Sequence, residues 1–232
     1  MIKVANAFHL KVIMCVIMAL DHMWWFIPGM PLAFHQAGRS VMPVFAFLLA
    51  QGMVHTRNRQ RYISLILWFA VATYAGNMLI AMWVGRAPPF NILFSFAVAA
   101  QMIVSIDSYI ANKNPLWLVV TPLLALVALM FDGAWLVTAP VLIFYYLRDR
   151  PVVMLAAYAV SVPAVMIILD ILFGFTFGDG QWMMVFAVIP LMFYNGERGV
   201  SIKYFFYVFY PLHMWIIYLI GMSRTGRFFW FQ

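Results

Sequence analysis

LKVIMCVIMALDHMWWFI, residues 10–27, is apolar enough to cross a bilayer as a helix except at one adjacent pair, Asp21 and His22. A transmembrane helix needs about 20 mainly apolar residues. An ionisable side chain at membrane depth costs roughly 2.5–3.5 kcal/mol on insertion scales, so it marks a candidate functional site by default. The stretch therefore predicts a membrane-spanning helix with proton or polar chemistry inside it.

The composition of the whole chain agrees with a membrane protein. Of its 232 residues, 66% are hydrophobic and only 9% are charged, which is more apolar surface than a soluble domain of this length needs. The formal charge of +7 comes from cations scattered between the apolar segments. Such cations orient a protein in the membrane, so the charge does not indicate nucleic-acid binding.

We expect an all-α fold, a polytopic transmembrane helical bundle of about nine spans in one domain, residues 1–232. The expected spans cover residues 10–28, 40–54, 63–84, 90–107, 116–131, 133–147, 152–173, 181–195 and 203–222. The second, sixth and eighth spans are short, which is consistent with tilted or partly re-entrant segments.

The lysines and arginines predict that the N-terminus is cytoplasmic. With this orientation ten lie on the inner side: Lys3, Lys11, Arg57, Arg59, Arg61, Lys113, Arg148, Arg150, Arg198 and Lys203. The outer side holds four: Arg39, Arg86, Arg224 and Arg227. Because cytoplasmic loops carry the excess of Lys and Arg, this count favours N-in and C-out.

On this map Asp21 and His22 lie in the outer half of the first span, and Arg39 begins the second span at a similar depth. Neighbouring helical positions point about 100° apart, so the two side chains should not face each other squarely. We expect Asp21 to reach Arg39 and His22 to face a polar cavity as a general base. The alternative is a buried polar pair that fixes helix packing.

His213 lies near mid-membrane in the last span, two residues after Pro211. A proline removes a helical hydrogen bond, and a helix loosened in this way often lines a cavity. The alternative is a histidine that hydrogen-bonds a neighbouring helix. Two histidines within the membrane are harder to explain by packing than one.

Several familiar motifs are absent from the sequence. It has no Walker loop, no dinucleotide-binding glycine fingerprint, no G-x-S-x-G elbow and no Cys/His spacing typical of a metal site. The sequence therefore predicts no metal site and no coupling to nucleotide hydrolysis.

The chain resembles the TraX family, the membrane acetyltransferases named for the pilin acetylase of F-type conjugation systems. The resemblance rests on several short motifs that occur in the same order over nearly the whole chain. The matching segments are ALDH at the end of residues 10–22, AGRSVMPVFAFLL (37–49), NILFSFAVAAQ (91–101), YVFYPLH (207–213) and, more weakly, YNGERG (194–199).

The resemblance implies a multi-pass protein of the bacterial inner membrane that transfers acetyl from acetyl-CoA to the N-terminal amine of pilin. The family is also similar to a broader group of transmembrane acyltransferases in which an intramembrane histidine receives or activates the acyl group. By motif that role falls on His22, with Asp21 orienting it, Arg39 as a stabilising cation and His213 as a second candidate.

Acetyl-CoA is charged and cytoplasmic, so this reaction would also need a phosphate site and a donor for the oxyanion. Arg57, Arg59 and Arg61 are the candidates for the phosphates, and the Asn91 amide or a cation is the candidate for the oxyanion. Whether His22 is a base or an acetyl carrier stays open. So do three alternatives: an acyltransferase acting on a glycan, a proton-coupled transporter using Asp21, His22 and His213, and a pilus-assembly scaffold.

Overall fold

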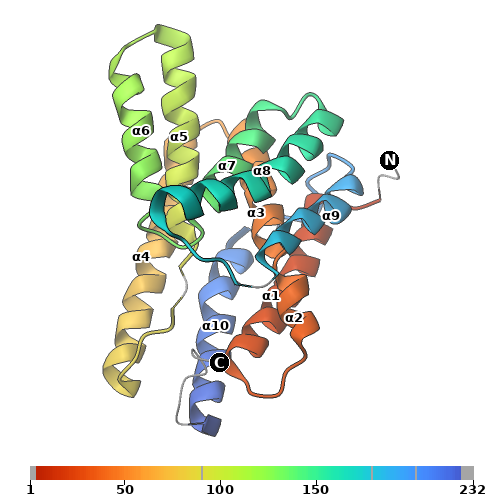
Figure 1. The fold of residues 1–232 in the computed structure, drawn as a ribbon, viewed down its shortest axis with the longest axis vertical. Coiled ribbons are helices and arrows are strands. Elements are labelled where there is room, and N and C mark those ends of the chain that lie inside the picture. Colours follow the sequence, from red (N-terminus) through yellow and green to blue (C-terminus); the bar gives the residue numbers. More distant parts are fainter. Residues whose placement is uncertain (1–3, 90, 179, 202, 226–232) are drawn as a thin grey trace. The chain divides into compact units, whose positions relative to one another are not determined.

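The structure, a computed structural model, describes residues 4–89, 91–178, 180–201 and 203–225, and over these residues it is helical without a named strand (Figure 1). An isolated bridge joins Ala5 and Tyr194. The helices are α1 (Ala7–Phe26), α2 (Leu32–Gly38), α3 (Val41–His55), α4 (Arg59–Val84), α5 (Leu93–Asn112), α6 (Leu116–Ala128), α7 (Ala134–Tyr146), α8 (Pro151–Phe173), the 3₁₀ helix η1 (Gln181–Ala187), α9 (Val188–Met192) and α10 (Lys203–Thr225).

Six of the helical segments are long and apolar enough to cross a membrane: Ala7–Phe26, Leu32–His55, Arg59–Val84, Leu93–Asn112, Pro151–Phe173 and Tyr204–Arg224. Three shorter apolar segments are Leu116–Ala128, Ala134–Tyr146 and Gln181–Met192. The all-helical membrane fold is therefore confirmed. Helices occupy all nine expected positions, but the count of nine spans and the cytoplasmic N-terminus stay predictions.

Two predicted boundaries differ from the observed helix ends by about four or five residues. The third span was expected to begin at residue 63, whereas α4 begins at Arg59. The second, expected over 40–54, agrees with α3 within one residue, although α2 precedes it in one apolar segment, Leu32–His55. The fourth was expected to end at residue 107, whereas α5 continues to Asn112. The charged Asp107 lies inside this helix, where its carboxylate forms an ion pair with Arg59.

The chain divides into two compact units, and each is described by itself. The first comprises Met1–Val44, Ala75–Pro89 and Asp179–Gln232, and the second comprises Phe45–Tyr74 and Phe90–Gly178. In the first unit α1 packs against α2 and α10; in the second α5 packs against α6 and α7, and α7 against α8 (Figure 1). The single transmembrane domain stays a prediction.

Helices α1 and α10 run parallel in the first unit. Along α1, the Lys11 ammonium lies 5.2 Å from the Phe206 ring centroid, and the Phe26 ring lies edge-on to Tyr218 at 5.3 Å. The residue numbers at these contacts therefore increase in the same direction along both helices, as they do in a parallel pair. This register places the middle of α10, with His213, beside the second half of α1.

Candidate functional site

His22 of α1 meets His213 of α10 in the interior of the first unit. The distance from His22 Nδ1 to His213 Nε2 is 2.8 Å, and the planes of the two rings lie within 18° of each other. Each residue is only 7% exposed. The structure therefore brings together the two intramembrane histidines that the sequence singled out from opposite ends of the chain.

The hydrogen bonds fix where the protons lie on these rings. The second nitrogen of His213, Nδ1, lies 2.6 Å from the carbonyl oxygen of Phe209, and a carbonyl can only accept. With both rings neutral, His213 therefore carries its proton on Nδ1 and accepts from His22 Nδ1–H through Nε2. It follows that the proton-accepting lone pair of His22 lies on Nε2.

Asp21 belongs to a second polar cluster, centred on His35 of α2. The Asp21 Oδ1 atom lies 2.8 Å from His35 Nδ1, and Arg39 donates to the other ring nitrogen, Nε2. Since an arginine can only donate, His35 Nε2 holds a lone pair and Nδ1–H donates to Asp21. A neutral imidazole thus links a carboxylate to a guanidinium, which also donates to Gln181 Oε1 at 2.6 Å.

Aromatic rings and a close backbone contact hold this cluster in place. The Trp24 ring stacks on His35 with centroids 4.0 Å apart, and Trp25 lies edge-on to it at 5.0 Å. A Cβ atom at Gly38 would overlap the Asp21 carboxyl group. Only glycine at position 38 lets α2 approach α1 closely enough for Asp21 to reach His35.

These contacts revise the partners expected from sequence. Asp21 was expected to contact Arg39, but it contacts His35, and the His35 ring lies between the two. Asp21 was also expected to orient His22, but the hydrogen-bond partner of His22 is His213. His35 was missed, although its spacing four residues before Arg39 places both on one face of a helix. Gln181 was also missed, and no signal in the sequence connects it with Arg39.

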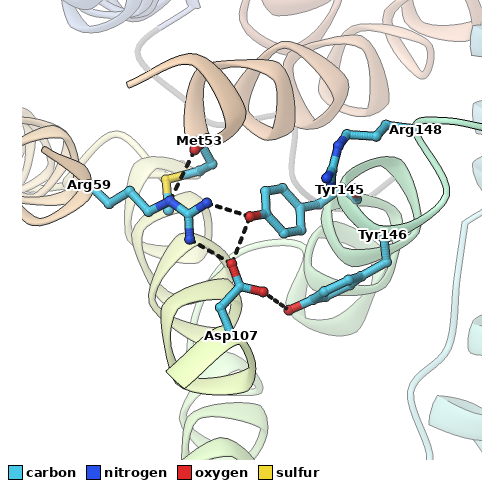
Figure 2. A network of polar contacts seen from close by, with 6 residues as sticks. All are labelled: Met53, Arg59, Asp107, Tyr145, Tyr146 and Arg148. Atoms are coloured by element: carbon cyan, nitrogen blue, oxygen red, sulfur yellow. Dashed lines mark hydrogen bonds and ion pairs between the residues drawn. The ribbon is translucent and has the colours of Figure 1, made fainter. Parts of the chain in front are cut away.

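The second unit holds the arginines proposed for phosphate binding, and it engages one of them fully (Figure 2). Arg59 donates from Nη1 to Asp107 Oδ2 at 2.6 Å, from Nη2 to the Tyr145 hydroxyl at 2.5 Å and from Nε to the Met53 carbonyl at 3.2 Å. Tyr145 and Tyr146 donate to the two oxygens of Asp107, at 2.7 and 2.9 Å.

Every nitrogen of the Arg59 guanidinium thus has a partner within the protein, and the network joins the start of α4 to the C-terminal parts of α5 and α7. The geometry gives Arg59 a structural role. Its neighbours Arg57 and Arg61 are exposed. Of the three candidates, only these two present their charges outward.

In the second unit, Asn91 connects helix α4 to the loop before α7 by hydrogen bonds. Its Nδ2 donates to the Ala70 carbonyl at 2.9 Å and its backbone N–H to Asp132 Oδ2 at 2.5 Å. Burial raises the pKa of Asp132 above its ordinary value, and the hydrogen bond from Asn91 opposes this shift. The Asn91 Oδ1 atom is buried and has no hydrogen-bond partner in the described part of the chain.

The fold and the first unit together define a class: a polytopic helical membrane protein with a buried pair of hydrogen-bonded histidines. The family model described as TraX protein matches residues 7–221, so the chain belongs to the TraX family. The match runs from the first residue of α1 into α10 and includes every residue of the two clusters.

One curated relative is named "Probable fimbrial assembly protein FimC, serogroup H1", from Dichelobacter nodosus. It is 26% identical over 246 residues, an alignment that covers 90% of this chain and 93% of the relative. No solved structure matches the chain significantly.

Proposed function

We propose that the protein is a membrane acetyltransferase that moves an acetyl group from acetyl-CoA to the N-terminal amine of a pilin. The observation that carries the proposal is the His22–His213 pair, which leaves the lone pair of His22 on Nε2. Membership of the TraX family supports it, as does the printed name of the relative, which concerns fimbrial assembly.

In the proposed reaction the amine nitrogen attacks the thioester carbonyl carbon and forms a C–N bond. His22 Nε2 takes the proton that the nitrogen loses. The tetrahedral intermediate then breaks its C–S bond, and the proton leaves with the thiolate as free CoA. His213 acts as a positioning residue, because it holds His22 in the tautomer with its lone pair on Nε2.

Arg39 would supply charge to the oxyanion. Its Nε atom is buried and has no hydrogen-bond partner among the described residues, while Nη1 donates to Gln181 and Nη2 donates to His35. In the proposed reaction this N–H is the donor for the developing negative oxygen. His35 keeps the guanidinium in place and links it to the Asp21 carboxylate.

The test is the mass of mature pilin from isogenic strains with and without the gene. The proposal predicts that pilin from the gene-bearing strain is heavier by one acetyl group, located at the N-terminal amine by fragmentation. Pilin of equal mass in both strains would refute pilin as the acceptor. Acetyl groups found instead on a surface glycan would move the activity to the glycan.

A carrier mechanism differs from a base mechanism by one covalent intermediate. If His22 carries the acetyl group, its Nε2 attacks the thioester first, and CoA leaves before the amine arrives. Rapid mixing of the purified protein with radiolabelled acetyl-CoA and no acceptor separates the two. Labelled protein that forms with release of CoA supports the carrier; no label under these conditions supports the base.

A further inference from the structure

A backbone clamp fixes the loop that follows α9 against the start of α1. Ala5 donates to the Phe193 carbonyl at 3.0 Å, Ala7 donates to the Glu197 carbonyl at 2.8 Å, and Asn195 donates to the Ala5 carbonyl at 2.8 Å. These bonds hold residues 193–197 beside the N-terminal end of α1. The next residue, Arg198, therefore lies at this end of the helix.

Lys11 lies on α1 one turn after Ala7, so the two side chains lie on the same face of the helix. The charge of Arg198 acts on the Lys11 ammonium, which is also close to the Phe206 ring. Within the described residues neither cation has a carboxylate within ion-pair distance. The carboxylate next in sequence to Arg198, that of Glu197, accepts a hydrogen bond from Asn195.

Two like charges at the same end of a helix without a counter-charge repel each other, so this arrangement favours binding of an anion. The N-terminus of α1 adds partial positive charge at the same end. A phosphate group would neutralise both side chains. Arg198 donates from Nη2 to Ser201 Oγ at 2.7 Å, and its remaining N–H groups are the donors for the phosphate.

The separation along α1 fits one phosphate-bearing molecule. Lys11 and His22 lie on the same helix, and eleven residues at 1.5 Å each make roughly 16 Å. The pantetheine arm of CoA is a chain of about twelve bonds, equal to about four extended residues or roughly 14 Å. The side chains of Lys11 and Arg198 supply the remaining reach. A CoA with its phosphates at this end would thus bring its thioester to His22.

We infer that Lys11 and Arg198 bind the phosphates of coenzyme A in the unit that contains His22 and His213. This inference rests on the proposed acetyltransferase function and assigns its co-substrate site. It differs from the expectation for Arg57, Arg59 and Arg61. The Arg59 guanidinium is engaged by Asp107, Tyr145 and Met53, and all three arginines belong to the second unit, whereas His22 and His213 belong to the first.

The experiment measures CoA binding to the purified full-length protein in detergent by isothermal titration calorimetry. Lys11→Gln and Arg198→Gln should each weaken CoA binding about tenfold or more, since each removes a charge-assisted hydrogen bond. Lys11→Arg should restore most of the affinity. The matched controls, Arg57→Gln and Arg61→Gln, should stay within about twofold of the wild type.

Turnover gives a second readout. The two glutamine variants should raise KM for acetyl-CoA and leave kcat near the wild-type value, as expected for lost ground-state and transition-state binding alike. Since Arg198 is exposed, its replacement should leave the fold intact. The Arg198→Gln variant therefore tests the site even if the Lys11→Gln variant is unstable.

The outcomes separate the inference from the function on which it rests. A wild-type protein that binds no CoA refutes the proposed acetyltransferase. A wild-type protein that binds CoA, with glutamine variants of equal affinity, refutes only the phosphate site. An anionic lipid headgroup offers the same phosphate chemistry. If the variants lose binding to nanodiscs containing phosphatidylglycerol and keep their CoA affinity, the pair binds lipid and the inference is wrong.

Discussion

Replacement of His213 by phenylalanine tests the central hydrogen bond of the site. Phenylalanine keeps a ring in α10 but removes the acceptor for His22 Nδ1–H, which lies 2.8 Å from His213 Nε2. A buried donor left without a partner costs about 1–3 kcal/mol. His22 recovers that energy by turning or by moving its proton, and either change takes the lone pair off the position it holds in the native site.

General acid–base catalysis contributes about 10²- to 10⁴-fold, so losing the correct tautomer should lower kcat about 100-fold, or about 2.7 kcal/mol of activation free energy. KM for acetyl-CoA should change little. His213→Gln should retain much more activity, because its amide oxygen can still accept from His22. Turnover is measured by release of free CoA thiol in the presence of a mature pilin peptide.

Two controls accompany this variant. His9→Gln changes an exposed histidine on α1, the helix that carries His22, and should leave kcat unaltered. The double variant His22→Ala, His213→Phe should be no slower than His22→Ala alone, because the second histidine acts only through the first. A His213→Phe protein that is folded and within twofold of wild-type kcat would refute the reasoning, as would additive losses in the double variant.

Three further predictions concern residues around the site and in the second unit. His35→Phe should keep the stack on Trp24 but release the guanidinium that it holds, lowering kcat about tenfold in the same CoA-release assay; unchanged kcat would contradict its positioning role. Arg59→Gln and Asp107→Asn should each lower the free energy of unfolding by about 1–2 kcal/mol, which is measured as a lower thermal midpoint. The double variant should lose less than the sum of the two changes, and the affinity for CoA should stay constant. Because the pKa of Asp132 is raised in the fold, its contribution to stability is fully present below the unfolded pKa and is lost as pH rises through the folded pKa. Asp132→Asn should therefore flatten the fall of the thermal midpoint as pH rises above the ordinary pKa of an aspartate, and an unchanged slope would contradict this.

The sequence was sufficient for the class of fold and for most helices, because long apolar runs have few alternatives to helices within a membrane. Helix α8 matches its expected span within one residue. The end of α5 was misplaced at residue 107, where the charged Asp107 lies inside the helix. Its partner, Arg59, lies 48 residues away in the chain, and no periodicity connects the two.

The site shows the same limit. Asp21, His22 and His213 stand out because ionisable groups are rare in apolar runs, and the structure places the two histidines in contact. Pairing depends on tertiary packing, so the sequence did not assign Asp21 to His35 or Arg39 to Gln181. The close approach at Gly38, which lets Asp21 reach His35, is visible only once both helices are placed.

The most direct test of the account is acetyl transfer by the purified protein itself. Wild-type protein in detergent is incubated with acetyl-labelled acetyl-CoA and a mature pilin peptide, and the labelled product is sequenced by mass spectrometry. The account predicts label on the N-terminal amine with the wild type, and loss of at least about 100-fold of this activity in a folded His22→Ala variant. Label transfer at the wild-type rate by that variant, or no transfer by the wild type, would contradict it.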